Sequence, residues 1–160
     1  MGLDSSVLIC FVEENPTHIA NLDRLFGAIA DGRLEAACSA MTLMECLVAP
    51  YRSANTALAE QYEAILTGSR GLRLVHVDLD LLRAAAQIRA ATRVKTPDAL
   101  HLASALRAGC TAFVTHDRRL PSIPGLRILQ LGDYASPGGG LHEKRRRYAT
   151  KAPPGKNPRR

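Results

Sequence analysis

The sequence predicts an α/β fold in which a central, mainly parallel sheet lies between two layers of helices. Short apolar runs rich in β-branched residues alternate with stretches of helical periodicity, and strands joined through one or two helices favour a parallel sheet with right-handed crossovers. The run at 110–115 lacks polar alternation, which is typical of a strand buried on both faces. With 160 residues, 46% of them hydrophobic, the chain has one-domain length and enough apolar side chains for a core.

The chain begins with a predicted strand at residues 1–4. The segment 5–12 is apolar throughout and ambiguous, because its β-branching favours a strand whereas the serines that precede it favour a capped helix. A helix then starts at Pro16 and Thr17, and Gly32 ends it. The apolar face of that helix consists of Ile19, Leu22, Phe26 and Ile29.

A second strand at residues 34–39 precedes two further helices and a third strand. The first of these helices runs from about residue 42 to residue 48, because Pro50 is expected to end it. The second covers residues 55–67, where apolar side chains recur at helical spacing. The third strand covers residues 72–77.

The remaining elements complete the sheet. Either Asp78 or Asp80 caps the next helix, whose buried stripe consists of Leu81, Ala84, Ala85 and Ile88. The following helix is capped by Thr96 and ended by Gly109, with an apolar face made of Ala99, Leu102, Ala103 and Leu106. Strands at 110–115 and 126–131 follow, and the fold ends near residue 134.

Positive charge is concentrated at the C-terminus. Residues 136–160 hold eight Lys or Arg and one acid, whereas residues 1–135 hold 13 basic and 14 acidic side chains. The C-terminal segment has almost no apolar surface to bury, so we expect a folded domain at 1–134 and a disordered basic tail at 135–160. The net charge of +6 therefore belongs to the tail.

Composition also bears on the cellular compartment. No run approaches the roughly 18 apolar residues of a membrane span, and no secretory signal is visible, so we expect a cytoplasmic protein with no membrane partner. The spacing of the four cysteines fits neither a zinc site nor a paired redox motif, which indicates reduced core residues.

Four acids lie where predicted strands end and helices begin, namely Asp4, Glu45, Asp98 and Asp117. In a parallel sheet these positions share one edge, where such folds bind their ligands. Four carboxylates at one edge would repel one another unless a cation lies among them, and all-oxygen ligands select a hard ion such as Mg²⁺ or Mn²⁺. The sequence therefore predicts a metal site at this edge.

Most of these acids also have an ordinary structural interpretation. The segment 42–45 fits a capping box, Asp98 is favoured by the dipole of the helix that it opens, and Asp117 can hold a turn. Asp4 is harder to explain in this way, because it precedes an apolar run where an unpaired carboxylate is costly. Asp78 also follows a strand, and we expect it only to cap its helix.

Four segments carry these acids: residues 3–9 (Leu-Asp-Ser-Ser-Val-Leu-Ile), 42–45 (Thr-Leu-Met-Glu), 96–106 (Thr-Pro-Asp-Ala-Leu-His-Leu-Ala-Ser-Ala-Leu) and 113–117 (Phe-Val-Thr-His-Asp). Together they resemble the four acidic motifs of PIN domains, in the order and separation found in the VapC-type toxins of bacterial toxin–antitoxin pairs. The resemblance covers about residues 1–134, and the basic tail is not part of it.

The resemblance implies a three-layer α/β/α fold with a helix at 5–12. It also implies a Mg²⁺-dependent endoribonuclease, in which Mn²⁺ can substitute, that cleaves RNA phosphodiester bonds with a metal-activated water. Such a protein is the toxin of a type II toxin–antitoxin system, works as a homodimer and is silenced by a cognate antitoxin.

The resemblance assigns roles by position. Asp4, Glu45, Asp98 and Asp117 are its catalytic acids, and Thr115 is a supporting hydroxyl. Asp4 and Asp98 bind the metal, with Glu45 and Asp117 binding directly or through water.

The roles of four basic side chains beside the acids stay open. Arg118 and Arg119 are candidates for contacting the RNA backbone, with a solvated turn as their ordinary interpretation. His101 and His116 are either catalytic or structural.

Two other classes of function compete with the nuclease. A receiver-like signalling domain needs an adjacent acidic pair after the first strand, where this chain has two serines after Asp4. The other alternative is a PIN-like module that binds RNA or a partner without cleaving.

Deletion of residues 136–160 should leave the domain folded and weaken RNA binding mainly at low salt. Each contact between the protein and a phosphate of single-stranded RNA contributes about −0.7 to the slope of log affinity against log salt. Loss of the contacts made by the tail should therefore make this slope less steep. Binding titrations of a labelled RNA at several salt concentrations measure it. An unchanged slope would show that the tail does not touch the RNA.

Overall fold

The structure, a computed structural model, describes residues 1–134, and the predicted tail at 135–160 lies outside them. Five strands form one sheet in the order β3-β2-β1-β4-β5, and every neighbouring pair is parallel. The strands are β1 (Gly2–Leu3), β2 (Ala36–Ser39), β3 (Leu72–Val75), β4 (Ala112–Thr115) and β5 (Arg127–Gln130). Each predicted strand is therefore present, although shorter than expected.

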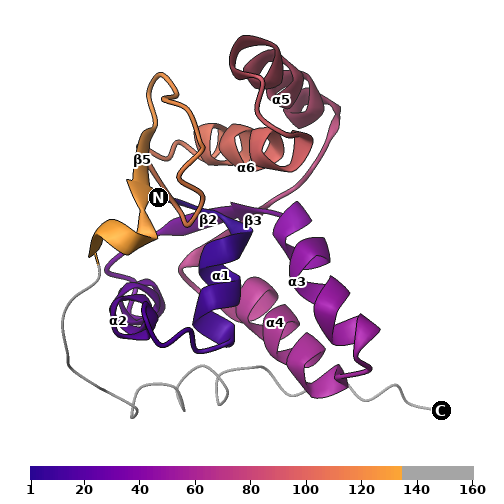
Figure 1. Cartoon of the computed structure of the whole chain (residues 1–160), viewed down its shortest axis with the longest axis vertical. Helices are drawn as coiled ribbons and strands as arrows, with labels where there is room; N and C mark the ends of the chain where they lie inside the picture. The colour runs from indigo at the N-terminus through magenta and orange to yellow at the C-terminus, as the bar shows by residue number, and fades with distance from the viewer. Residues whose placement is uncertain (135–160) are drawn as a thin grey trace.

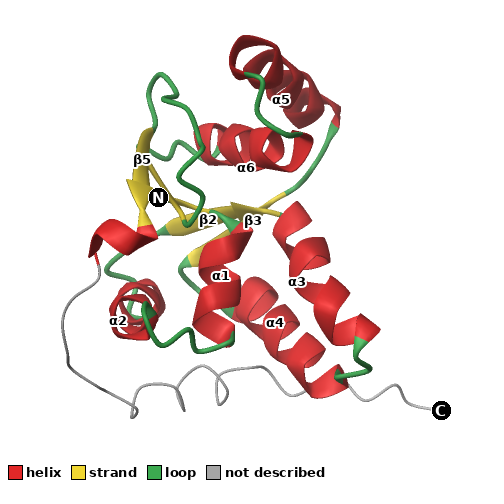
Figure 2. Ribbon diagram, viewed as in Figure 1, coloured by secondary structure: helices red, strands yellow, loops and turns green. Residues whose placement is uncertain are grey.

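Helices cover both faces of the sheet, as the sequence predicts (Figures 1 and 2). One layer consists of α1 (Ser5–Val12), α2 (Ile19–Ala30), α3 (Met41–Arg52) and α4 (Thr56–Gly68). The other consists of α5 (Leu79–Thr92) and α6 (Thr96–Arg107), and a 3₁₀ helix, η1 (Leu131–Tyr134), ends the described chain. The ambiguous segment at 5–12 is a helix.

Alternate residues of the strands supply the two halves of the core. Leu3 and Val114 pack with the first helical layer, whereas Ala37 and Phe113 pack with α5 and α6. This alternation follows from the two-residue period of a strand, and it explains why the strands are apolar on both faces.

The central strand β1 requires a glycine because α6 lies close against it. Gly2 is aligned with Ala37 of β2 and Phe113 of β4. A Cβ atom on Gly2 would lie 2.6 Å from the Cβ of Ala105 in α6 and 2.7 Å from the ring of Phe113. The absence of a side chain at this position therefore sets the distance between the sheet and α6.

Strand order reverses beside β1, since β2 and β3 extend to one side and β4 and β5 to the other. At such a point the connections leave the sheet in opposite directions, and the carboxyl edge opens into a crevice. Asp4 follows β1 directly, and its amide donates to the carbonyl of Val114 in β4 at 3.0 Å. The end of β1 and the end of β4 are thus joined at the point where a ligand site is expected.

Helix α6 differs from the prediction at two positions. Lys95 is its N-cap, so Thr96 is the first helical residue and does not cap the helix. Leu106, expected on the buried face, is 36% exposed, because the buried part of α6 ends at Ala105. The helix stops where expected, since Gly109 adopts a left-handed φ of +71°.

Pro50 lies inside α3, which contradicts the expectation that it ends this helix. The helix continues to Arg52, and Ser53 caps it by donating from its hydroxyl to the Ala49 carbonyl at 3.0 Å. Proline in the last turn removes only one hydrogen bond, and here its ring is buried in the core.

Helix α2 begins later than predicted. The backbone turns at residues 16–18, where the Thr17 amide donates to the Asn15 side chain at 3.1 Å, and the helix starts at Ile19. Proline and threonine here shape the preceding turn.

Substitution Gly2→Ala should destabilise the domain by about 1–3 kcal/mol, because the added methyl group overpacks the contact between β1 and α6. Thermal melting or urea titration measures the change. The control is Gly68→Ala, whose Cβ would meet no atom within 4 Å. Equal stability of Gly2→Ala and wild type would show that α6 does not pack as closely as described.

Candidate active site

The candidate site lies at the carboxyl edge of the sheet, where β1 and β4 end. Asp4 is held there by hydroxyl groups: Ser6 and Thr115 each donate to its Oδ2 at 2.7 Å. Among the described residues, its other oxygen, Oδ1, has only a 3.5 Å contact with the Ser5 hydroxyl. One oxygen of Asp4 is therefore fixed by the protein, and the other is open to a ligand.

Thr115, the last residue of β4, links two of the acids. Its side chain is fully buried, it donates to Asp4, and its hydroxyl oxygen accepts the amide of Asp117 at 3.0 Å. A β-branched residue suits this strand, and its hydroxyl fixes the turn that follows. This geometry matches the supporting role that the sequence predicts, and the role itself stays a prediction.

Asp98 is in the first turn of α6, close to two other carboxylates. Burial raises the pKa of Asp98, and the negative charges of Asp4 and Asp117 raise it further, against a hydrogen bond from the Lys95 amide. The three carboxylates thus lie close enough to repel one another. Asp98 lies in the first turn of α6, the position at which a helix dipole favours an acid.

Asp117 is oriented by Arg119. The Arg119 side chain donates from Nε to Oδ1 at 2.9 Å and from Nη2 to Oδ2 at 2.8 Å, and its amide donates to Oδ1 at 2.8 Å. These hydrogen bonds lower the pKa of Asp117 to about 2. Asp117 therefore remains ionised, with a cation already beside it.

Glu45 is on α3 and faces His101 of α6. Nε2 of His101 lies 2.9 Å from Oε2 of Glu45. Burial acts to raise the pKa of Glu45, but hydrogen bonds from His101 and Ser5 outweigh it and the pKa is lowered. The capping-box interpretation of 42–45 is wrong, because Ala40 is the N-cap of α3 and Glu45 lies beyond its first turn.

The pairing of Glu45 with His101 was not predicted from the sequence. His101 lies on the face of α6 that carries apolar residues, so its burial could have been inferred, but a partner 56 residues away could not.

The remaining predicted side chains lie at the rim of the site. Arg118 is exposed and pairs with Asp133 at 3.0 Å. The exposed His116 contacts the buried ring of His18 edge-on, with centroids 5.1 Å apart, and its amide donates to Ser6 at 3.3 Å. Asp78 caps α5 as expected, accepting the Leu81 amide at 2.8 Å.

The donors at this site suit a hard cation, although they are not gathered into a compact cage. Within residues 1–134, no group of three or more His, Cys, Asp or Glu side chains is placed to hold a metal ion. Asp117 is hydrogen-bonded to Arg119, and Glu45 is hydrogen-bonded to His101. Mg²⁺ fits such a site, because it binds through one or two carboxylates and keeps several waters.

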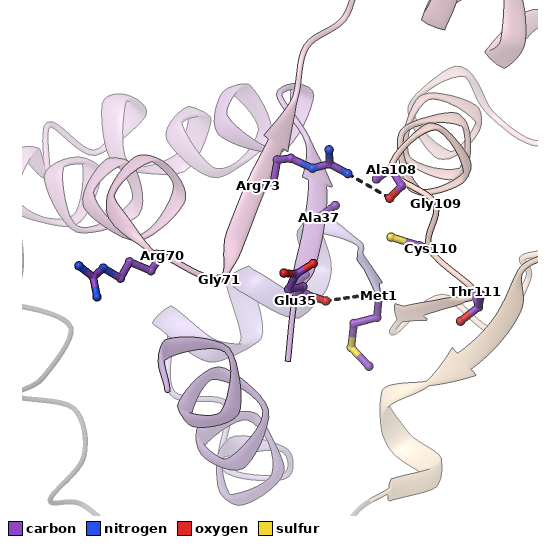
Figure 3. A pocket seen from close by; sticks show the side chains of 11 residues that line it. Met1, Glu35, Ala37, Arg70, Gly71, Arg73, Ala108, Gly109, Cys110 and Thr111 are labelled. Carbon is purple, nitrogen blue, oxygen red and sulfur yellow. Dashed lines mark hydrogen bonds between the residues drawn. The ribbon is translucent and has the colours of Figure 1, made fainter. Parts of the chain in front are cut away.

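A second concave region lies at the opposite edge of the sheet (Figure 3). It is a cavity of about 440 Å³ at the amino ends of the strands, lined by residues that include Glu35, Arg73 and Cys110. Arg73 donates to the Ala108 carbonyl at 3.0 Å across it. None of the four acids lines this cavity, so it is separate from the candidate site.

Comparison with known proteins identifies the fold independently. A family model for the PIN domain matches residues 1–126. No curated protein matches the sequence. Among residues 1–134, no helix is both long and apolar enough to cross a membrane.

Three solved structures are similar to the chain. A toxin–antitoxin complex from Klebsiella pneumoniae has 18% identity and a TM-score of 0.59, with 78% of this chain and 92% of that chain covered. VapBC2 from Rickettsia felis, bound to promoter DNA, has 15% identity and a TM-score of 0.61, with 80% and 96% covered. DNA-bound VapBC from Salmonella typhimurium has 25% identity and a TM-score of 0.55, with 81% and 96% covered.

Substitution Asp98→Asn should leave the protein in EDTA as stable as wild type or more stable at pH 7. A raised pKa means that ionised Asp98 disfavours folding at neutral pH, and this cost disappears as the pH falls below the ordinary value of 3.8. The gain in Tm should therefore shrink in acid. The Asn side chain can still accept a hydrogen bond from the Lys95 amide.

Asp78→Ala is the contrasting control, since it removes a helix cap and should lower the Tm. If Asp98→Asn melts well below wild type while Asp78→Ala does not, the roles of the two acids are reversed.

Proposed function

The chain belongs to the PIN domain family, and from this premise we propose that it is a metal-dependent endoribonuclease that serves as the toxin of a type II toxin–antitoxin pair. The observation that carries the proposal is the convergence of Asp4, Asp98 and Asp117 at the reversal of strand order, where burial and the negative charges of Asp4 and Asp117 raise the pKa of Asp98.

Each acid has a distinct task in this proposal. Asp4 and Asp98 bind Mg²⁺, or Mn²⁺ in its place, and Glu45 and Asp117 bind directly or through water. When bound, the cation supplies Lewis-acid activation of water and neutralises charge on the phosphodiester. Thr115 keeps the bound oxygen of Asp4 in place, and Arg119 keeps Asp117 ionised.

Two arginines at the rim suit the RNA backbone. The side chains of Arg118 and Arg119 are 72% and 77% exposed, although each has a carboxylate partner within the chain. Exchange of a carboxylate for a phosphate oxygen preserves the charge-assisted hydrogen bonds of a guanidinium. We assign both to the positioning of RNA.

Protein partners follow from the similar structures. These are a toxin–antitoxin complex and two VapBC complexes, which supports a cognate antitoxin as partner. Exposed apolar side chains on α3 and α5 provide surfaces that an antitoxin or a second copy in a homodimer would cover. They are Met44, Val48, Tyr51, Leu79 and Leu82. The proposed action on RNA places the protein in the cytoplasm.

The receiver-like alternative disagrees with the topology. Receivers have the flavodoxin-like strand order 2-1-3-4-5, whereas this sheet has the order 3-2-1-4-5. A PIN domain that binds RNA without cleaving it is the alternative that the next experiment tests.

The purified full chain should cleave single-stranded RNA in Mg²⁺ or Mn²⁺ and stop when EDTA is added. Asp4→Asn and Asp98→Asn should each lower the rate by about 100-fold or more, because each removes charge that stabilises the transition state. Asp78→Ala is the matched control and should retain the rate. Gel analysis of a labelled RNA measures all four proteins.

Two outcomes would contradict the proposal in different ways. Undiminished cleavage in EDTA would exclude the metal mechanism. Binding of RNA without cleavage in either metal would favour the non-cleaving alternative.

A further inference from the structure

His101 is buried among apolar residues and has one polar partner in the described chain. Its side chain is 2% exposed, and Nε2 contacts Oε2 of Glu45 at 2.9 Å. The other ring nitrogen, Nδ1, has no hydrogen-bond partner within residues 1–134. The contact with Glu45 therefore provides the only polar anchor of this ring.

The direction of this hydrogen bond follows from the chemistry of the two groups. An ionised carboxylate only accepts, so Nε2 must carry the proton and donate it. Nδ1 is buried without a hydrogen-bond partner in the described chain, so Nε2 is the ring atom that is oriented by a polar contact. His101 is thus a fixed donor aimed at Glu45.

The pair connects the two helical layers across the site. Glu45 belongs to α3, which packs with α1 and α4, whereas His101 belongs to α6 on the other face. Asp98 lies three residues before His101, on the same side of α6. Ser5, which follows Asp4, also hydrogen-bonds Glu45. The carboxylate of Glu45 is therefore held between the segments that carry Asp4 and Asp98.

A glutamate has three rotatable side-chain bonds and, at 24% exposure, space to move. Without a rigid donor, its carboxylate would sample positions away from Asp4 and Asp98. His101 donates to Oε2 of Glu45, and Ser5 also hydrogen-bonds this carboxylate. Carboxylates that bind metals are commonly oriented by such outer hydrogen bonds.

We propose that His101 is a positioning residue that fixes the carboxylate of Glu45 toward the cation shared with Asp4 and Asp98. This inference rests on the proposed metal-dependent function. His101 itself binds neither cation nor RNA in this proposal, because its ring is enclosed and its only hydrogen bond within residues 1–134 is to Glu45.

The test is calorimetric titration of Mn²⁺ into the full chain and into matched variants. His101→Gln keeps an amide N–H at a reach similar to Nε2, whereas the shorter side chain in His101→Asn cannot reach Glu45. We expect Mn²⁺ affinity within about threefold of wild type for His101→Gln and a loss of about 10–100-fold for His101→Asn. Ser104→Ala, a buried change one turn along α6, should leave the affinity unchanged.

A double-mutant cycle separates positioning from general damage to the helix. In a Glu45→Gln background, His101→Asn should cause no further loss of Mn²⁺ affinity, since the oriented carboxylate is already absent. Thermal melting of each variant establishes that it is folded. If His101→Asn does not fold, His101→Gln carries the test, and a loss of about 10-fold or more in that variant would overturn the inference.

The outcomes distinguish this inference from the proposed function. Wild-type affinity in folded His101→Asn, or an equal loss in both backgrounds, would overturn the role of His101 while the metal-dependent function stands. Absence of Mn²⁺ binding in the wild type would overturn both.

Discussion

The reversal of strand order beside β1 is the constraint from which the candidate site follows. Two strands extend from β1 on one side and two on the other, so the carboxyl edge opens where β1 meets β4. The amide of Asp4 is bonded to β4 at this point, and Thr115 at the end of β4 reaches back to the Asp4 carboxylate. Because Gly2 has no side chain, α6 packs close to β1. The first turn of α6 therefore places Asp98 near Asp4. Segments more than 90 residues apart in the sequence thus meet because of the topology.

The negative charges of the acids at this edge repel one another, and each acid is stabilised by different hydrogen-bond partners. Asp4 is bound by hydroxyl groups, Asp117 by the guanidinium of Arg119, and Glu45 by the imidazole of His101. Burial and the negative charges of Asp4 and Asp117 raise the pKa of Asp98, against a hydrogen bond with the Lys95 backbone. A cation bound beside Asp98 would relieve the repulsion from Asp4 and Asp117. The repulsion between the carboxylates therefore affects both the stability of the metal-free domain and the binding of the cation that the proposed chemistry requires.

Much of the fold could be predicted because local patterns decided it. Apolar runs marked the strands, Gly109 marked the end of α6, and the position of the acids at strand ends indicated a shared edge. Errors arose where packing overrode local preference: buried Pro50 stays within α3, and Leu106 remains partly exposed. The partners of the acids could not be predicted, because the contact between Glu45 and His101 depends on how two helices from opposite layers approach one another. The hydrogen bond from Arg119 to Asp117 could not be predicted either, because it depends on the conformation of the turn that carries both residues.

The central claim is that Asp4, Asp98 and Asp117 share one cation site. The most direct measurement is the pKa of the Asp98 carboxyl group, followed by ¹³C NMR as a function of pH with and without Mg²⁺. The account predicts that Asp98 in the metal-free protein titrates above the ordinary value of 3.8, and that Mg²⁺ or the substitution Asp117→Asn lowers its pKa. An Asp98 pKa at or below the ordinary value, unchanged by Mg²⁺, would contradict it.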